Sequence, residues 1–406
     1  MESTDRASQR SAGPLQGWTL VASAWLAVIA SGALLGPVLP RMTDQFRSVP
    51  HVKVLVSLVA TLPALFVALL AAPFGILADR AGYRRLLVCA ALLYGFLGIA
   101  PYWLHSLYAI VISRGIVGFA EAAIMTGATA LIGHYFRSSD SARWYALQAG
   151  SAPLVAIVAI ALGGGLGDSD WHNVFLVYGF AFVIFVLVVT FLWEPPREAA
   201  RSAAAQDAFM NSAVVDWPRL LMISAITVFS FSAFMVTVIQ TGSLLNERGI
   251  PSPRMIGFWQ SIASLANPLG ALLFGLWAAK PLSKLTTSLL LMSAGFAVIG
   301  LQPSWQAVIV GAVITNLGCG LVQPTLVTWA LADIADAARG KAAGTWLSAA
   351  FLGQFLSPLS IVWLENVCGS LSSALVCYSI ACLLMAAVVV LAVRESPGQP
   401  GESETA

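Results

Sequence analysis

The sequence VISRGIVGFAEA, residues 111–122, decides the class of fold, because it places an arginine and a glutamate inside an apolar run from about residue 107 to residue 132. A run of that length can cross a lipid bilayer as a helix, which takes roughly 20 residues. A charged side chain at the bilayer centre costs about 2.5–3.5 kcal/mol on insertion scales. Arg114 and Glu121 therefore need a partner or a function inside the membrane.

Arg114 and Glu121 are separated by two helical turns, so they lie on one face of the predicted helix, about 10.5 Å apart along its axis. Gly118 lies on the same face between them and is expected to leave that face open. The guanidinium and the carboxylate are then expected to meet, directly or through water. Two readings of the pair stay open: a group that couples transport to protons, and a fixed bridge that only pins this helix.

The composition of the chain is that of a polytopic membrane protein. Of its 406 residues, 58% are hydrophobic and 10% are charged, and the mean hydropathy is +0.83. A soluble protein carries about 25% charged residues. The net charge of +2 includes no basic run, so no nucleic-acid partner is expected. The first apolar run, residues 18–40, is too long for the core of a signal peptide.

The pattern of apolar runs predicts an all-α protein with twelve transmembrane helices. One long polar segment divides them into two pseudo-symmetric halves of six. The predicted spans are residues 18–39, 54–76, 86–103, 107–132, 144–166, 174–193, 219–244, 256–278, 286–301, 307–332, 342–364 and 371–393.

The domain organisation follows from these spans. It comprises a tail (1–17), a first bundle (18–193), a linker (194–218), a second bundle (219–393) and a second tail (394–406). Fifteen Lys and Arg residues fall on the side that holds both tails and the linker, five fall on the other, and Arg114 completes the 21. Cytoplasmic loops carry the excess of positive charge. Both termini are therefore predicted to be cytoplasmic, in an inner or plasma membrane.

An internal repeat supports the division into halves. The loop 275–284 follows the eighth predicted span as the loop 75–85 follows the second, and Arg80 and Arg84 correspond to Lys280 and Lys284. Asp79, in contrast, corresponds to Ala279. The segment 140–143 likewise corresponds to 336–341. Two six-helix halves joined by a loop are typical of a transporter whose binding site lies between them.

The loop Gly75-x-Leu77-Ala78-Asp79-Arg80-x-Gly82-x-Arg84-Arg85 resembles the signature between helices 2 and 3 of the major facilitator superfamily. Further resemblances are Arg114-x-x-x-Gly118, Gly164-Gly165, Trp171-x-x-x-Phe175 and Arg339-Gly340. The resemblance covers nearly the whole chain. It implies the major facilitator fold, with alternating access by rocking of the two halves. It also implies that Gly75, Asp79, Arg80, Gly82 and Arg84 form a cytoplasmic gate, in which Asp79 latches against the start of helix 11. A carboxylate is favoured at a helix N-terminus.

The segment from Arg114 to Ala122 also resembles helix 4 of the proton-coupled organic-anion symporters and of the spinster-like lysolipid transporters. That resemblance implies proton coupling by Glu121. Arg114 would either bind an anionic substrate or control the protonation state of Glu121. The sequence departs from the spinster-like group because residues 18–39 hold no charge. Its segment Gly150-Ser-Ala-Pro153 matches the helix-5 signature of drug/proton antiporters only loosely.

The remaining polar residues of the predicted spans are uncharged candidates for a substrate cavity. Alternatively, each is a contact between helices or an interfacial aromatic. They are Trp25, Gln148, Gln240, Trp259, Gln260, Asn267, Asn316, Gln323, Trp329, Trp346 and Gln354. Because Arg114 is the one cation among the candidates, a small organic anion or an amphipathic molecule fits best as substrate.

Other function classes lack their motifs. The sequence contains no Gly-x-Ser-x-Gly, no His-Glu-x-x-His and no P-loop, so an enzyme is not expected. The four histidines fall near membrane edges and the five cysteines show no pairing pattern, so no metal, cofactor or disulfide is expected. A sensor on a transporter scaffold is the alternative from a different class. The expected partners are a small-molecule substrate, protons and the lipid bilayer. A monomer is expected. The compact loops resemble those of drug exporters, and this resemblance favours export over uptake.

Overall fold

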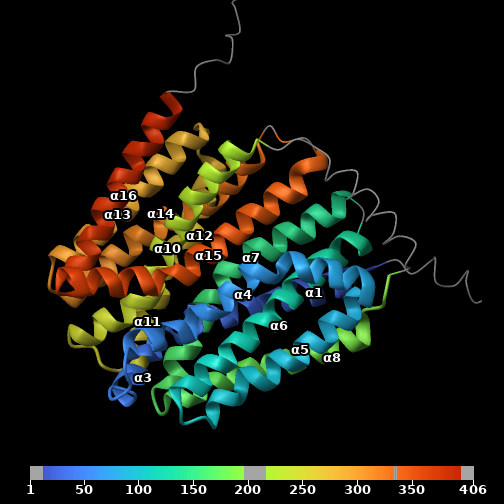
Figure 1. The fold of residues 1–406 in the computed structure, drawn as a ribbon, viewed down its shortest axis with the longest axis horizontal. Helices are drawn as coiled ribbons and strands as arrows, with labels where there is room; N and C mark the ends of the chain where they lie inside the picture. The colour runs from blue at the N-terminus through green and yellow to red at the C-terminus, as the bar shows by residue number, and fades with distance from the viewer. Residues whose placement is uncertain (1–11, 137, 196–215, 333, 335, 395–406) are drawn as a thin grey trace, which may run out of the picture.

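The computed structural model describes residues 12–136, 138–195, 216–332, 334 and 336–394, and this part of the chain is helical (Figure 1). The elements of the first half are α1 (Pro14–Ala30), α2 (Gly32–Leu35), η1 (Gly36–Val38), α3 (Leu39–Gln45), α4 (Val52–Ala81), α5 (Tyr83–Ile99), η2 (Ala100–Tyr102), α6 (Leu107–Tyr135), α7 (Ser138–Gly167), η3 (Trp171–Gly179) and α8 (Phe180–Phe191). Those of the second half are α10 (Trp217–Glu247), α11 (Pro253–Ser264), α12 (Ala266–Leu276), α13 (Pro281–Leu301), α14 (Trp305–Leu331), α15 (Asp336–Cys368) and α16 (Leu371–Arg394).

Ten of these helices are long and apolar enough to cross a membrane, and the bent segment from α1 to α3 makes an eleventh. The bend of 49° follows Ser31, whose backbone is extended, and Pro37 and Pro40 then begin new helical turns. The eighth predicted span, 256–278, is instead two helices of 12 and 11 residues that meet at Leu265. Each half-span is about 17 Å long, which is shorter than the hydrocarbon core.

The sequence places a tight polar turn over residues 75–85, and this prediction is wrong in its extent. Helix α4 continues to Ala81 and carries Asp79 and Arg80 within its last turn. The chain then turns at one residue, Gly82, with φ of +103°, before α5 begins. A side chain at Gly82 would also collide with the carboxylate of Glu194, at 2.7 Å from its Cδ, so this turn requires glycine.

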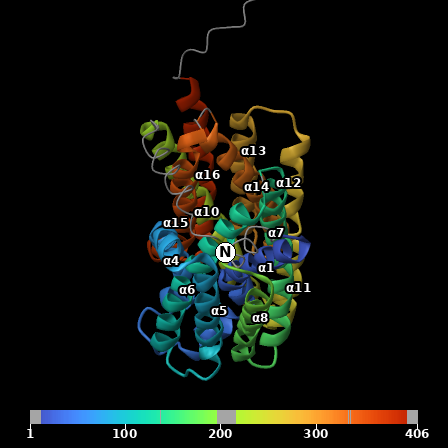
Figure 2. The same cartoon turned by 90° about the vertical axis from the view of Figure 1, so that its right-hand side faces the viewer.

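The apolar side chains form two separate cores. The first is built from α1–α8 together with Met235 and Ile239 of α10, and the second from α10–α16. Figure 2 shows the second half, yellow to red, stacked on the first half, blue to green. Most of the two predicted tails and of the predicted linker lies outside the described residues, which include residues 12–17 of the first tail and residue 394 of the second.

The two halves contact each other mainly toward one end of the bundle, which we call the closed end. There Gly36 faces Gly242 and Gly164 faces Gly257, so closely that a Cβ on Gly242 would lie 2.6 Å from the Gly36 carbonyl oxygen. The polar links between the halves include Lys53 to Glu365, Ser252 to Asp168, and Ser261 to the carbonyl of Ile157.

The opposite end, which we call the open end, holds the first residues of α1 and α10. Glycines near this end of α4, α7 and α15, namely Gly75, Gly150, Gly340 and Gly344, have nothing within 4 Å of the position of a Cβ. Two ring contacts at this end each join residues of the same half. Trp18 packs edge-on against Trp144 in the first half, and the Lys341 ammonium lies over the Trp217 ring in the second half. The polar links and glycine contacts named here between the halves thus lie toward the closed end.

Two adjacent glycines of α7 provide a matched test of the closed end. A Cβ on Gly164 would lie 2.6 Å from the Pro253 carbonyl oxygen and 2.8 Å from the Gly257 Cα, whereas one on Gly165 would meet nothing within 4 Å. Overpacking costs about 1–3 kcal/mol, and separation of the halves relieves it. We expect Gly164→Ala to increase the population opened at this end by roughly 5- to 150-fold.

The measurement is the rate at which a maleimide labels Asn246→Cys, in a background without the native cysteines. Asn246 lines the cavity at the closed end. The Gly165→Ala control is expected to label as the parent does. Equal rates in the two alanine variants would show that the glycine contact does not hold this end closed.

Candidate functional site

Helix α6 brings Arg114 and Glu121 into the interior of the first half. Its glycine face packs on α4, where a Cβ on Gly118 would lie 2.6 Å from the Cα of Pro63. Gly115 similarly faces the ring of Phe66 at 3.3 Å. The expectation that Gly118 leaves an open face is therefore wrong, because α4 fills that space. Helix α6 also packs against α1 and α5.

The guanidinium of Arg114 has no exposed surface and is held from two sides. Its Nη2 donates to the carbonyl oxygens of Leu97 at 3.1 Å and Gly98 at 3.2 Å. These carbonyls belong to the C-terminal turn of α5, the negative end of the helix dipole. On the other side the guanidinium carbon lies 4.5 Å from the ring centre of Tyr178 and 5.3 Å from that of Phe175, within cation–π range.

Glycine at position 98 makes this arrangement possible. A Cβ there would lie 2.6 Å from the side chain of Tyr178, so any larger residue would displace the ring that covers Arg114. The Tyr178 hydroxyl donates to the Ile29 carbonyl at 3.2 Å, which ties the ring to α1. Helices α1, α5 and α6 and η3 thus meet around one cation.

Glu121 is 2% exposed, and its Oε2 has no hydrogen-bond partner among the described residues. It does not form a direct ion pair with Arg114, whose Nε and Nη1 are also unpartnered. The electrostatic field of Glu121 reaches both Tyr94 and Tyr178. Tyr94 donates to the Leu26 carbonyl at 2.6 Å, and its ring centre lies 5.5 Å from that of Tyr178. We call Arg114, Glu121, Tyr94 and Tyr178 the buried polar cluster.

The buried polar cluster holds an ionisable acid whose protonation state depends on its surroundings. Burial favours the neutral acid of a carboxyl, whereas a nearby cation favours the carboxylate. A buried acceptor without a partner costs free energy, and a proton placed on it removes the charge that burial penalises. A small change in hydration or in the distance between Arg114 and Glu121 can therefore shift the balance.

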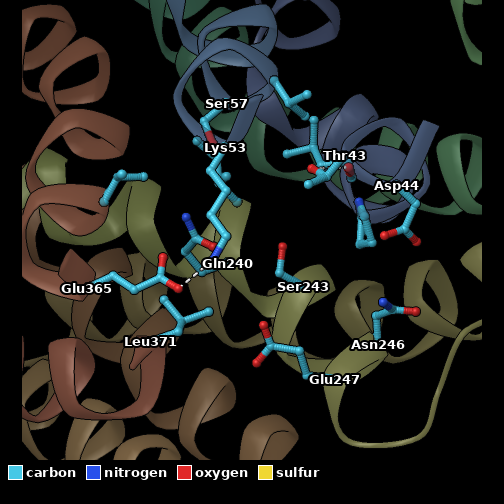
Figure 3. A pocket seen from close by; sticks show the side chains of 15 residues that line it. Thr43, Asp44, Lys53, Ser57, Gln240, Ser243, Asn246, Glu247, Glu365 and Leu371 are labelled. Carbon is cyan, nitrogen blue, oxygen red and sulfur yellow. Dashed lines mark hydrogen bonds and ion pairs between the residues drawn. The ribbon is translucent and has the colours of Figure 1, made fainter. Parts of the chain in front are cut away.

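A second polar site is a cavity of about 240 Å³ between the two halves at the closed end (Figure 3). Asp44 of α3, Glu247 of α10 and Glu365 of α15 contribute carboxylates to its lining, and Lys53 of α4 contributes the cation. The Lys53 Nζ lies 2.6 Å from a Glu365 oxygen, and this ion pair crosses from one half to the other.

A further link between the halves lies beside this cavity. Ser252 donates its hydroxyl to Asp168 at 2.8 Å, and Arg41 approaches the same carboxylate at 3.8 Å. The Ser252 hydrogen bond, with help from Arg254 and Arg41, lowers the pKa of Asp168 below its ordinary value. Asp168 therefore stays ionised at neutral pH and keeps its partners at the closed end.

The uncharged cavity candidates make a variety of contacts in the described structure. Gln240 lines the closed-end cavity, and the buried Gln260 donates to the Val238 carbonyl at 2.6 Å. Trp25 donates to Ser151, next to Gln148 on α7, and Trp346 packs edge-on against Phe231. Asn316 donates to the carbonyl of Ala312 in its own helix. Asn267 and Gln354 are half-buried and Gln323 is exposed. Trp259 packs on Trp305, and the Trp329 carbonyl accepts from Arg219.

The gate motif lies at the open end. Asp79 is exposed and accepts a hydrogen bond from the Tyr83 hydroxyl within the first half. Arg84 donates to the Val189 carbonyl at 2.8 Å, and Arg80 is exposed. No ion pair joins Asp79 to the part of α15 whose side chains are described. In this open state the motif is tied to its own half.

Sequence reasoning missed Tyr94, Tyr178 and the Lys53–Glu365 pair. Buried tyrosines in apolar runs signal a hydroxyl that needs a partner, and this signal was available. The ion pair joins residues 312 positions apart and left no local signal. Among the described residues, no cluster of three or more His, Cys, Asp or Glu side chains is suited to hold a metal.

Comparison with known proteins gives a family match and distant relatives. The sequence profile of the Major Facilitator Superfamily matches residues 20–251. A protein of Agrobacterium vitis that is named as a tartrate transporter is 22% identical over 365 residues, covering 82% of this chain and 80% of that one. The inner membrane transport protein RhmT of Escherichia coli (strain K12) is 26% identical over 364 residues, covering 80% of each.

Solved structures match over nearly the full length. A bacterial homologue of the human lysosomal transporter Spinster, inward-facing and unoccupied, superposes with a TM-score of 0.74 and 16% identity, over 96% of this chain and 100% of that one. A POT family transporter in complex with 5-aminolevulinic acid gives 0.73 and 13% identity, over 92% and 95%. At these identities the likeness establishes the fold alone, and it confirms the predicted fold class.

The packing of Arg114 on Tyr178 is testable by a double-mutant cycle. Arg114→Met removes the cation and Tyr178→Leu removes the ring, and we expect a coupling free energy of about 0.5–2 kcal/mol between them. The measurement is the free energy of unfolding in mixed micelles. Tyr178→Phe keeps the ring and is expected to retain most of the coupling. A coupling near zero for Tyr178→Leu would contradict the cation–π contact.

Proposed function

The chain belongs to the Major Facilitator Superfamily, and from that premise we propose that it is a proton-coupled transporter of a small organic anion. Membership makes it a multi-pass membrane protein and a secondary transporter rather than an enzyme. The observation that carries the proposal is the buried polar cluster, in which Glu121 and Arg114 are both buried yet do not neutralise each other by a direct contact.

Glu121 is proposed as the proton carrier. It is an ionisable group in the interior of a span, with an oxygen free to take a proton or a new partner. Intramembrane carboxyl groups of this kind form proton relays in transporters. When the halves rock, hydration of the first half changes from one side to the other. Glu121 then loads a proton on one side and releases it on the other.

Arg114 is proposed to set the state of Glu121 rather than to bind substrate itself. The α5 carbonyls and the Tyr178 ring already hold its guanidinium, which has no exposed surface. Direct contact with a substrate would require it to leave these partners. From its present place Arg114 acts on Glu121 through the electric field, which is strong at low dielectric. This favours the second of the two roles that the helix-4 resemblance implies.

A small organic anion is the proposed substrate class. The relative from Agrobacterium vitis is named for tartrate, a small dicarboxylate. The alternative of lysolipid transport rests on the helix-4 resemblance and on the Spinster homologue, whose likeness concerns the fold. A sensor that binds without transport would show no accumulation in vesicles.

The proposed orientation puts the open end and both termini in the cytoplasm. It rests on the excess of Lys and Arg on the side of the termini. RhmT, one of the relatives, is named as an inner membrane transport protein. In this orientation the described structure is inward-open, and Lys53, Glu365, Asp168 and Ser252 close the outer side.

Asp79 provides a test of the cytoplasmic gate. We expect Asp79→Asn to weaken the outward-open state, because that state brings the carboxylate to the start of α15, while the inward-open state changes little. Transport should fall several-fold, and labelling of Gly344→Cys from the cytoplasmic side should rise. Ala279→Asn at the repeat-related position is the control. Unchanged labelling and unchanged transport in Asp79→Asn would remove Asp79 from the gate.

Glu121→Gln tests proton coupling. Glutamine keeps the shape and an acceptor but cannot titrate, so it mimics a permanently protonated carboxyl. In proteoliposomes with an imposed pH gradient, we expect accumulation of a small carboxylate such as tartrate to be lost, while counterflow exchange is largely retained. Running the gradient in both directions also distinguishes symport from antiport and tests the expectation of export.

Asp170→Asn, which removes an exposed carboxyl in the loop before η3, is the control for Glu121→Gln. The fixed-bridge reading predicts a different pattern, because a buried cation that loses its counter-charge destabilises the fold. Protein level and both transport modes would then fall together. Gradient-driven accumulation that survives in Glu121→Gln would assign the proton to another residue.

A further inference from the structure

The α15–α16 hairpin brings together two cysteines that show no pairing pattern in the sequence. Cys368 is the last residue of α15, and Cys377 lies in the second turn of α16. Their sulfur atoms are 3.4 Å apart, both as free thiols, and both side chains are half-buried. From this geometry we propose that Cys368 and Cys377 form a disulfide at the outer face of the membrane.

The local backbone fixes the two thiols relative to each other. Helix α15 ends at Gly369, with φ of +80°, whose N–H donates to the Glu365 carbonyl at 2.8 Å. Ser370 then caps α16 through the Ser373 N–H at 3.1 Å. Because the connection is this short, the thiols cannot move far apart. A disulfide has an S–S distance of about 2.0 Å, so rotation of the side chains has to close only a small gap.

The compartment favours oxidation. In the proposed orientation, on which this inference rests, the hairpin tip faces the outer side. Disulfides persist in the periplasm and at cell surfaces, whereas cytoplasmic thiols stay reduced. Cys368 lies at the helix end and so can meet a soluble oxidant. Cys377 lies about 9 Å along the axis of α16 from its first residue, Leu371. It needs to meet only Cys368, not the oxidant.

The reaction is a balanced thiol–disulfide exchange with a disulfide oxidant such as oxidised glutathione. The Cys368 thiolate attacks one glutathione sulfur, the glutathione S–S bond breaks, and one glutathione thiolate leaves. The Cys377 thiolate then attacks the Cys368 sulfur of the mixed disulfide. The second glutathione leaves as a thiolate, and the two cysteine protons pass to solvent.

The position of the cross-link suggests its role. Both cysteines belong to the second half, so rocking of one half against the other does not stretch the bond. Glu365 lies one helical turn before Cys368 and pairs with Lys53 across the halves. The disulfide would hold the end of α15 on α16 and keep Glu365 in place, as a structural staple rather than a switch.

The first test uses the purified full-length protein, reduced and then incubated with oxidised glutathione. After alkylation under denaturing conditions, peptide mass spectrometry is expected to find the Cys368 and Cys377 peptides joined, with the loss of two hydrogen atoms. Cys368→Ser and Cys377→Ser should each abolish the cross-link, and Cys89→Ser should keep it. Two alkylated thiols, or a lasting glutathione adduct on Cys368, would overturn the geometry.

The second test determines whether the disulfide is present in the protein as it occurs in cells. Membranes from cells are alkylated without reductant, and the same cross-linked peptide is expected. A cross-link in the purified protein together with free thiols in cells would contradict the proposed disulfide. The wrong premise would then be the outer location of the hairpin, not the closeness of the two thiols. Neither test uses transport as a readout, so its failure is distinct from failure of the proposed proton coupling.

Discussion

A guanidinium with no exposed surface is the constraint around which the first half is arranged. Removing a charge from water is costly, and the surrounding groups must offset that cost. The last carbonyls of α5 accept from Arg114, and the ring of Tyr178 covers it. The glycine face of α6 lets α4 approach on the other side, which closes the core around the charge. Helices α1, α5 and α6 and η3 therefore meet around one cation, and a movement of any of them changes the electric field at Glu121.

The contact between the halves has the opposite character. At the closed end the backbones approach through glycines, and the polar links are few and partly exposed. Exposed ion pairs contribute little free energy, typically about 0–1 kcal/mol. An interface of this kind can keep the halves together at the closed end and still allow them to separate. A rigid half with a charged interior and a weakly held partner half are together what a rocking transporter requires.

The sequence was sufficient for the fold class and for the residues that bear charge inside the membrane. Hydropathy located the spans, and the cost of burying charge singled out Arg114 and Glu121. The sequence was not sufficient for the contacts of these two side chains. Helical periodicity predicts which face of the helix they share and how far apart they lie along its axis, but it does not predict their rotamers. The carbonyls that hold Arg114 are backbone groups, which any helix end could offer. The helix breaks at Ser31 and Leu265 lie inside apolar runs, where composition does not change.

Contacts between side chains of different helices were beyond prediction for a related reason. The Lys53–Glu365 pair and the approach of Cys368 to Cys377 depend on how helices cross, which hydropathy does not encode. The motif residues were easier, since Gly82 has a left-handed backbone that only glycine adopts without strain. Gly82 lay within the predicted loop 75–85, but the continuation of α4 through Asp79 and Arg80 was not predicted.

The central claim is that Glu121 exchanges a proton within a buried polar cluster. Infrared difference spectroscopy of the protein in lipid, compared with Glu121→Gln, tests this most directly. The account predicts a protonated carboxyl band that belongs to Glu121, disappears as the pH is raised, and moves to a different pH range when Arg114 is replaced by methionine. A Glu121 carboxyl that stays ionised over the whole range, or ignores the loss of Arg114, would contradict it.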